Sequence, residues 1–363
     1  MVLEIYITTT CNKNCEYCYL QKHKDKLYPQ ELNKPEIIKK NCQILLNYFL
    51  ENNIKISNID LFSGEIIGTE LWYSIIMMLK DASIKGLDIE TIVVPTNGYF
   101  LVDDDIRIKI EELLTDLRSH GIRLIFSFSD DGAVLDEINR PLASGKDQDK
   151  EKFYFEAKQF ARKYEHGFHP MVNAHGIDKW ADNYKWWKEY VKDLPPYDIL
   201  SNVMCLEVRN DEWTDEAIEG YLKFLKVYTE TLPESYPQMP IEELVLILCN
   251  KANATFKSPK GLKRLPFSQS YQPFGLLSGN RISCALTHAW CVRLGDLAIC
   301  PCHRLGYDHL LYGKYKVEND RITGIQANNI QLFLSNYVTG YNGFLKCDAC
   351  PIREYCMKGC RGA

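Results

Sequence analysis

The spacing of the cysteines constrains this chain more than any other feature of its sequence. Of its 14 cysteines, three fall within residues 11–18 and eight within 284–360. Cysteines that only fill a core do not gather in this way, whereas metal ligands must. The remaining three, Cys42, Cys205 and Cys249, are therefore predicted to be ordinary core residues.

Several features favour a cytoplasmic, reducing compartment, where disulfides are rare. The N-terminus shows no secretory signal, and no apolar run of about 18 residues would span a membrane. The net charge of −5 argues against a general nucleic-acid binder, and the basic run Lys22–Lys26 is interpreted as a solvated loop. The two groups of cysteines therefore predict metal sites.

The first part of the chain alternates strand-like and helix-like segments, which is typical of β–α units stacked around a parallel sheet. The expected strands are 2–8, 56–62, 88–95, 123–128, 167–173 and 202–208. The expected helices are 34–50, 69–85, 104–119, 150–164, 179–192 and 214–231, the last beginning at Thr214 before two acidic residues. Six units are fewer than the eight of a closed barrel. We therefore predict an α/β fold, a partial (β/α)6 TIM barrel, whose open side suits a large substrate.

Three segments with different patterns suggest the domain organisation. Residues 1–231 are the predicted barrel, and the proline-rich residues 232–279, with one clear helix, are a bridging segment. Residues 280–363 show little periodicity and form a predicted loop-rich, cysteine-rich module, in which metals would replace a missing core. The composition, 46% hydrophobic and 25% charged, suits one large domain with a smaller one.

The N-terminal cysteines follow the first predicted strand directly. The spacing of Cys11, Cys15 and Cys18 lets one loop place three thiolates around a [4Fe–4S] cluster. Because there is no fourth cysteine nearby, one iron would keep an open position, as a catalytic metal site requires. A structural zinc site is the alternative.

The Cys-x3-Cys-x2-Cys loop, with the aromatic Tyr17 before its last cysteine, resembles the radical S-adenosylmethionine (SAM) superfamily. The resemblance implies that the open iron binds the amine and carboxylate of SAM. It also implies that reductive cleavage yields a 5′-deoxyadenosyl radical, which takes a hydrogen atom from the substrate. The cofactor carries this chemistry, and the protein orients and shields it.

Two further turns resemble motifs of the same superfamily. Ser63, Gly64 and Glu65 end the second predicted strand and are similar to the Gly-Gly-Glu-Pro turn that holds the methionine amine, with Ser63 in place of the first glycine and Ile66 in place of the proline. Taken without the cysteines, this segment would be an ordinary strand-to-helix turn.

The third and fourth strands end in residues that resemble peptide-modifying members. Thr96 and Asn97 end the third strand, and Ser129 and Arg140 stand in a stretch similar to Ser-x-Asp-Gly…Asp…Arg. The resemblance implies that Ser129 and Arg140 contact the nucleoside and carboxylate of the cofactor, although the spacing to Arg140 is one residue short.

Glu207 and Arg209 share one face of the sixth predicted strand. They are candidates for contact with substrate or cofactor. A structural ion pair, or a face that points outward, is an equally good interpretation.

The C-terminal cysteines resemble the SPASM domain, which implies two auxiliary [4Fe–4S] clusters. On that pattern the first cluster has the ligands Cys284, Cys291, Cys300 and Cys360, and the second has Cys347, Cys350 and Cys356. The second cluster lacks a fourth ligand. Three explanations compete: the module is cut short, Cys302 completes the cluster, or one iron stays open to substrate.

The combination of domains predicts a radical SAM peptide maturase that forms a thioether or carbon–carbon crosslink in a ribosomally made precursor peptide. Alternatives are a peptide epimerase and an anaerobic sulfatase maturase. The sulfatase maturase carries an aspartate base after the cysteine that corresponds to Cys300, where this chain has Pro301. Asp296 and His303 are the remaining candidate bases, with Cys302 as a candidate substrate-facing group.

The expected partners follow from this function. They are the precursor peptide, a flavodoxin or ferredoxin-type reductant, and a separate leader-binding protein, with no membrane or nucleic acid. A non-catalytic iron–sulfur electron carrier is the alternative from another class, and the open-iron loop argues against it.

Overall fold

The computed structural model describes residues 2–62, 64–146, 149–164, 166–194, 204–206, 213–230, 241 and 289–328. The predicted site residues that lie outside the described residues are Ser63, Glu207, Arg209, Cys284, Cys347, Cys350, Cys356 and Cys360. Most of the bridging segment, with Cys249, also lies outside the described residues.

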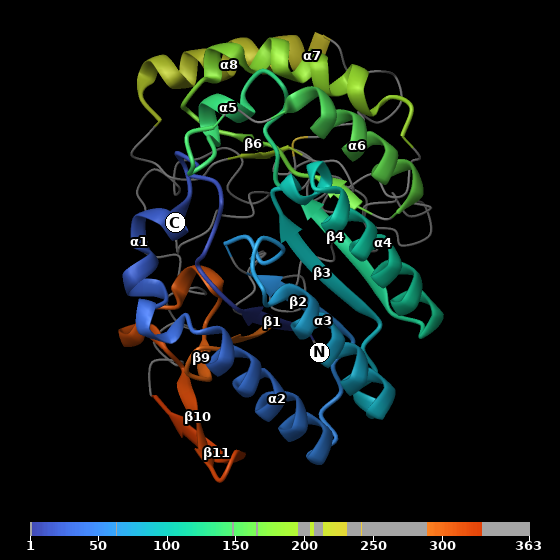
Figure 1. Cartoon of the computed structure of the whole chain (residues 1–363). Coiled ribbons are helices and arrows are strands. Elements are labelled where there is room, and N and C mark those ends of the chain that lie inside the picture. Colours follow the sequence, from blue (N-terminus) through green and yellow to red (C-terminus); the bar gives the residue numbers. More distant parts are fainter. Residues whose placement is uncertain are drawn as a thin grey trace, which may run out of the picture.

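The described elements follow the order expected of β–α units (Figure 1). The strands are β1 (Val2–Tyr6), β2 (Asn58–Phe62), β3 (Thr91–Thr96), β4 (Arg123–Phe128), β5 (His166–Phe168), β6 (Met171–Val172), β7 (Cys205–Leu206), β8 (Ala289–Arg293), β9 (Ala298–Cys300), β10 (Gly313–Glu318) and β11 (Arg321–Ala327). The α-helices are α1 (Tyr19–Leu27), α2 (Pro35–Glu51), α3 (Trp72–Ala82), α4 (Asp104–Ser119), α5 (Asp136–Asn139), α6 (Lys150–Lys163), α7 (Trp180–Val191) and α8 (Asp215–Glu230).

One sheet of nine strands organises the described part of the chain, in the order β11-β10-β9-β8-β1-β2-β3-β4-β5. Strands β1 to β5 are parallel to their neighbours, and β8 is parallel to β1 on its other side. A separate parallel pair joins β6 to β7. Because the ends of parallel strands that carry the following loops meet at one edge, residues after β1, β2, β3 and β4 are brought together there.

Apolar side chains on the strands and helices form the core. Leu3 and Ile5 of β1 are fully buried in a cluster with Ile59 and Leu61 of β2 and with residues of α2 and α3. Figure 1 shows α2, α3 and α4 running along one face of strands β1 to β4. Burial of these helix faces fixes the strands that carry the candidate site.

The expected helices and the first four expected strands are found with small shifts at their ends, whereas only residues 204–206 of the expected strand 202–208 are described. Four of the expected strands correspond to β1–β4, and the expected helix 104–119 matches α4. The predicted start of the last helix is also confirmed, because Thr214 Oγ1 accepts a hydrogen bond from the Ala217 backbone N–H at 3.3 Å. The expected strand 167–173 is instead two short strands, β5 and β6, which pair with different neighbours and are separated by His169 and Pro170.

Two expectations need correction. Residues 289–328 are not poor in regular structure, because they form β8 to β11 and bury Val292 and Ile299 in the main core. These strands are short and separated by turns, so the alternation of apolar and polar residues was too brief to be recognised in the sequence. The basic run Lys22–Lys26 belongs to helix α1 rather than to a loop, although its side chains are exposed as expected.

Candidate metal centre

The three N-terminal cysteines lie on one loop between β1 and α1. Cys11, Cys15 and Cys18 are free thiols and are partly exposed. The loop is compact, because the Cys18 backbone N–H donates to the Cys15 carbonyl at 3.1 Å, and helix α1 starts directly after Cys18. We call residues 11–18 the cysteine loop.

The surroundings of the cysteine loop shield two of its thiols from most of the solvent. Burial raises the pKa of Cys11 to about 11 and that of Cys15 to about 12, and the Arg140 guanidinium opposes both shifts. Metal binding requires thiolates, so binding at this loop would release protons.

The cysteine loop carries the donor set of a [4Fe–4S] cluster. Among the described residues, no group of three or more His, Cys, Asp or Glu side chains is arranged to hold one metal ion. In a [4Fe–4S] cluster each thiolate binds a different iron, so the sulfurs stand farther apart than the ligands of one ion. Three free thiols on one loop match that donor set.

The turn after β2 packs directly on the start of the cysteine loop. The Gly64 backbone N–H donates to the Thr8 carbonyl at 2.8 Å, and the Glu65 N–H donates to the Thr10 carbonyl at 2.7 Å. A Cβ atom at Gly64 would lie only 2.3 Å from the Thr10 carbonyl oxygen. Only glycine allows this approach.

The Glu65 carboxylate connects the ends of β2 and β3. It accepts hydrogen bonds from Thr96 Oγ1 at 2.9 and 3.0 Å, from the Asn97 N–H at 2.7 Å and from the Ile67 N–H at 3.2 Å. Glu65 is only 3% exposed, and burial raises its pKa above the ordinary value. The carboxylate is thus occupied by protein donors.

Asn97 joins β3 to the cysteine loop. Its Nδ2 donates to Asn12 Oδ1 at 2.6 Å, and its Oδ1 accepts from the Tyr99 N–H. Ser129, at the end of β4, donates its backbone N–H to the Thr96 carbonyl. Thr96, Asn97 and Ser129, which the resemblance selected at the ends of β3 and β4, therefore lie side by side next to the cysteine loop.

The segment after α5 binds the cysteine loop through its backbone. The Asn14 backbone N–H donates to the Pro141 carbonyl at 2.8 Å, and the Glu16 backbone N–H donates to the Asn139 carbonyl at 2.8 Å. An isolated antiparallel bridge joins Lys13 to Leu142. The loop is therefore held on the side of β4 as well as on the side of β2.

Tyr17 and Arg140 belong to a buried polar network. Arg140 Nη1 donates to the Tyr17 hydroxyl at 3.0 Å, and that hydroxyl donates to Asp131 Oδ1 at 3.0 Å. Asp131 also accepts from Asn139 Nδ2 at 3.0 Å and from the Met171 N–H at 2.8 Å. The structure thus brings two of the predicted cofactor-binding residues together at Cys15.

Sequence reasoning did not select Lys13 and Asp136 as site residues. Lys13 lies between two cysteines, its side chain is fully buried, and its Nζ forms an ion pair with Asp136 Oδ2. Arg140 Nε lies 3.3 Å from Asp136 Oδ1. A lysine inside a cysteine loop, followed by an aspartate in a Ser-Asp-Asp-Gly…Asp stretch, was the available signal.

A second pair of cysteines lies on neighbouring strands. Cys291 of β8 and Cys300 of β9 are paired in register, are free thiols and are buried. A hydrogen bond with Cys300 and burial raise the pKa of Cys291. Both pack in an apolar cluster with Tyr6 and Leu20, against which Cys18 also packs. Two of the four predicted ligands of the first auxiliary cluster are thus adjacent.

The candidate bases differ in their surroundings. Burial would raise the pKa of Asp296, but the hydrogen bond from Arg293 and that from Lys314 hold it below its ordinary value. This arrangement does not favour Asp296 as a base. His303 stacks on Phe62 with ring centroids 3.7 Å apart, and its Nδ1 lies 3.4 Å from Glu4 Oε2. Cys302 is buried beside it.

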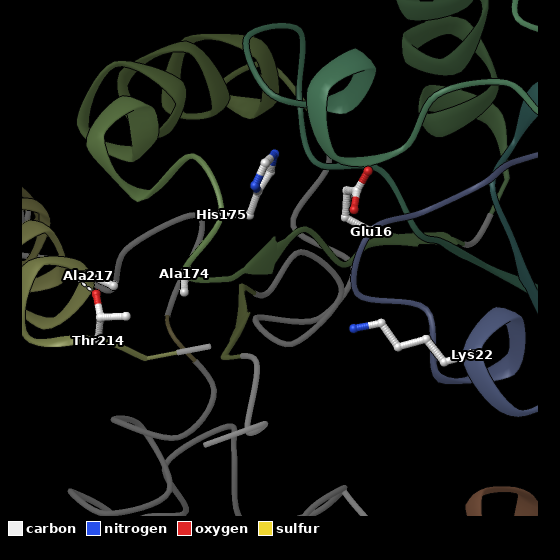
Figure 2. Close-up of a pocket in the computed structure, with 6 residues that line it drawn as sticks. All are labelled: Glu16, Lys22, Ala174, His175, Thr214 and Ala217. Atoms are coloured by element: carbon white, nitrogen blue, oxygen red, sulfur yellow. Dashed lines mark hydrogen bonds between the residues drawn. The ribbon is translucent and has the colours of Figure 1, made fainter. Parts of the chain in front are cut away.

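A pocket of about 330 Å³ opens beside the cysteine loop. Its described lining residues are Glu16, Lys22, Ala174, His175, Thr214 and Ala217. Figure 2 shows Glu16 and Lys22 on one side, Thr214 and Ala217 at the start of α8 on the other, and Ala174 and His175 between them. His175 lies between β6 and the short helix that precedes α7.

The fold described so far combines three features. They are a partial barrel, a three-cysteine loop at the edge where its strands end, and two cysteines on neighbouring strands beside that loop. No model of a protein family matches the sequence, and no curated protein matches it. No described helix is both long enough and apolar enough to cross a membrane. Solved structures, in contrast, show a clear likeness.

The fold of the chain is similar to that of anSMEcpe in three solved structures. The native structure of anSMEcpe with bound AdoMet superimposes with a TM-score of 0.65 at 16% identity, covering 100% of this chain and 90% of that chain. The structure with AdoMet and the Kp18Cys peptide gives 0.63 at 17% identity, covering 99% and 89%. The structure with AdoMet and the Cp18Cys peptide gives 0.58 at 17% identity, covering 100% and 90%.

Proposed function

We propose that this chain is a radical SAM peptide maturase that crosslinks a ribosomally made precursor peptide. The observation that carries the proposal is the cysteine loop, because Cys11, Cys15 and Cys18 offer three free thiols and the described part of the chain offers no fourth cysteine on that loop. A cluster held there would supply an electron for the reductive cleavage of SAM. The likeness to a solved structure with bound AdoMet supports the use of SAM, the coarser part of this proposal.

The residues around the cysteine loop would bind and orient SAM. Backbone carbonyls of the turn at Gly64 would accept from the methionine amine, because the Glu65 carboxylate already has donors. Arg140 would meet the carboxylate, and Ser129 would contact the nucleoside. Thr96 and Asn97 are buried, so water does not compete for the hydrogen bonds by which they brace this turn.

A peptide substrate is supported by the likeness to anSMEcpe in complex with peptides. The pocket between Glu16 and Thr214 lies next to the cysteine loop and would take part of that peptide. Its lining carries both acidic and basic side chains, which suits a polar peptide segment.

The strand-borne cysteines would hold the first auxiliary cluster. Cys291 and Cys300 would be two of its ligands, with Cys284 and Cys360 as the predicted others. A crosslink removes two hydrogen atoms from the peptide, and SAM cleavage accounts for one of them. The auxiliary cluster would accept the remaining electron, and a base would take the proton.

The second candidate function is an anaerobic sulfatase maturase, which the likeness to anSMEcpe favours. Mass spectrometry of a candidate peptide separates the two functions. The precursor would be a short peptide encoded beside this chain, coexpressed with it anaerobically. A peptide that loses two hydrogen atoms and gains an internal linkage in tandem spectra supports crosslinking. Formylglycine in a sulfatase peptide would contradict it.

A further inference from the structure

Two buried cations share one carboxylate beside the cysteine loop. The Lys13 side chain is fully buried and the Asp136 residue is 3% exposed. Lys13 Nζ pairs with Asp136 Oδ2, and Arg140 Nε lies 3.3 Å from Asp136 Oδ1. Each cation thus uses a different oxygen of the same group.

Arg140 divides its guanidinium between Asp136 and the cysteine loop. Its Nη1 donates to the hydroxyl of Tyr17, which lies between Cys15 and Cys18 in the cysteine loop, at 3.0 Å. An arginine prefers to bind a carboxylate with two parallel hydrogen bonds. Arg140 does not do so here: its Nε lies 3.3 Å from Asp136 Oδ1 without forming a hydrogen bond, and Lys13 pairs with the other oxygen.

We propose that Lys13 is a positioning residue: by occupying one oxygen of Asp136, its ammonium keeps Arg140 turned toward the cysteine loop, where the guanidinium receives the SAM carboxylate. This inference rests on the proposed function. Without Lys13, the carboxylate of Asp136 would be left buried with Arg140 as its only described ion-pair partner. Arg140 would then take both oxygens and turn away from Tyr17.

The test measures SAM binding to the reconstituted holoenzyme, by its Kd and by the change that SAM causes in the EPR spectrum of the reduced cluster. Lys13→Met is expected to weaken SAM binding at least about tenfold. Arg140 would then turn to Asp136, and its hydrogen bond to the charged SAM carboxylate would be lost. Adding Asp136→Asn removes the competing charge and frees Arg140. The double variant is therefore expected to bind within about threefold of wild type and to recover the spectral change.

A purely structural role for Lys13 predicts that the double variant binds SAM no better than Lys13→Met. Removing both Lys13 and Asp136 would then disrupt the site at least as much as removing Lys13 alone. Wild-type affinity in Lys13→Met, or a double variant no better than the single one, overturns the proposal. If Lys13→Met yields no folded holoenzyme, the double variant decides: binding near the wild-type value supports the proposal and absent binding overturns it.

A matched control lies on the same short helix. Glu137→Gln breaks an exposed ion pair with Lys150, whose atoms lie 2.9 Å apart, and is expected to leave SAM binding unchanged. The two proposals fail differently. If wild-type holoenzyme binds no SAM, the proposed function is wrong. If wild type binds and Lys13→Met binds equally well, only the role of Lys13 is wrong.

Discussion

The two cysteine sites of this molecule are built in opposite ways. The cysteine loop is irregular, and polar bonds from the segments that follow β2, β3 and β4 hold it in place. Cys291 and Cys300 lie on paired strands, inside an apolar cluster with Tyr6 and Leu20. A polar frame suits a site that must also bind a polar cofactor, whereas an apolar surround shields a cluster from water. The comparison predicts that the two sites can be broken separately.

The largest expected effect comes from Cys300→Ser. A hydroxyl is a poor ligand for iron–sulfur clusters, so the iron of the strand-borne site should be lost and peptide product should disappear. Release of 5′-deoxyadenosine from the cysteine loop should continue, because that loop keeps its three thiols. Iron per chain and 5′-deoxyadenosine would be measured on the same sample.

The matched control is Cys42→Ala, which removes a buried thiol of α2 that lies in the main core. It should keep the iron of both sites. If Cys300→Ser abolished 5′-deoxyadenosine while the loop kept its iron, the two sites would not be independent.

Gly64→Ala should break the cysteine loop and spare the strand-borne site. The new Cβ would lie 2.3 Å from the Thr10 carbonyl oxygen, so the backbone must move, at a cost of about 1–3 kcal/mol. We expect most of the loop iron to be lost and 5′-deoxyadenosine to fall at least about tenfold. Gly324→Ala on β11 is the control, because a Cβ added there would have no atom within 4 Å. Equal loss in both variants would refute the packing argument.

Glu65→Gln should have a smaller effect on the same loop. The amide group cannot accept from all the donors that the carboxylate satisfies, so one buried donor is left unpaired, which costs about 1–3 kcal/mol. Thermal unfolding temperature and SAM cleavage would both decrease, by about tenfold for cleavage. Glu112→Gln, at an exposed position of α4, should change neither. An unchanged Glu65→Gln enzyme would mean that Glu65 does not brace the turn.

The smallest expected effect is a pH dependence at Asp130. Burial and the nearby charge of Asp136 raise its pKa to about 7, while Tyr154 and the Gly132 N–H donate to Oδ1. Because the folded-state pKa is raised, the stability that Asp130 contributes is complete below its unfolded pKa and is lost as the pH rises through about 7.

Asp130→Asn keeps the acceptor and removes this titration. Urea unfolding of the anaerobic holoenzyme between about pH 5 and 8 should show the variant gaining on wild type up to about pH 7, with a constant difference above it. The exposed Asp105→Asn is the control. A constant difference across this range would show that Asp130 does not titrate in the folded protein.

Much of the barrel could be predicted because its signals are local. The alternation of apolar residues indicated four strands and the boundaries of α4, and Thr214 marked the start of α8. The cysteine loop was also local, since its three ligands lie within one short segment. The break between β5 and β6 was not predicted, because it depends on which neighbour each short strand pairs with.

The rest of the candidate site depends on contacts between distant segments. Lys13 and Asp136 are far apart in sequence, and neither is unusual by itself. The backbone bonds between the cysteine loop and residues 139–142 bring them together. Strand β8 also depends on a distant segment, because it pairs with β1, which lies near the other end of the sequence. The same holds for Glu65. Its turn motif could be recognised in the sequence, but its hydrogen-bond donors Thr96 and Asn97, at the end of β3, could not be predicted.

The most direct test of the central claim is the formation of 5′-deoxyadenosine by the reconstituted, dithionite-reduced protein under anaerobic conditions. The cysteine loop is expected to cleave SAM, so wild type should release 5′-deoxyadenosine and Cys15→Ala should release none. If wild type made none, or if Cys15→Ala made as much as wild type, the cysteine loop would not be the catalytic centre.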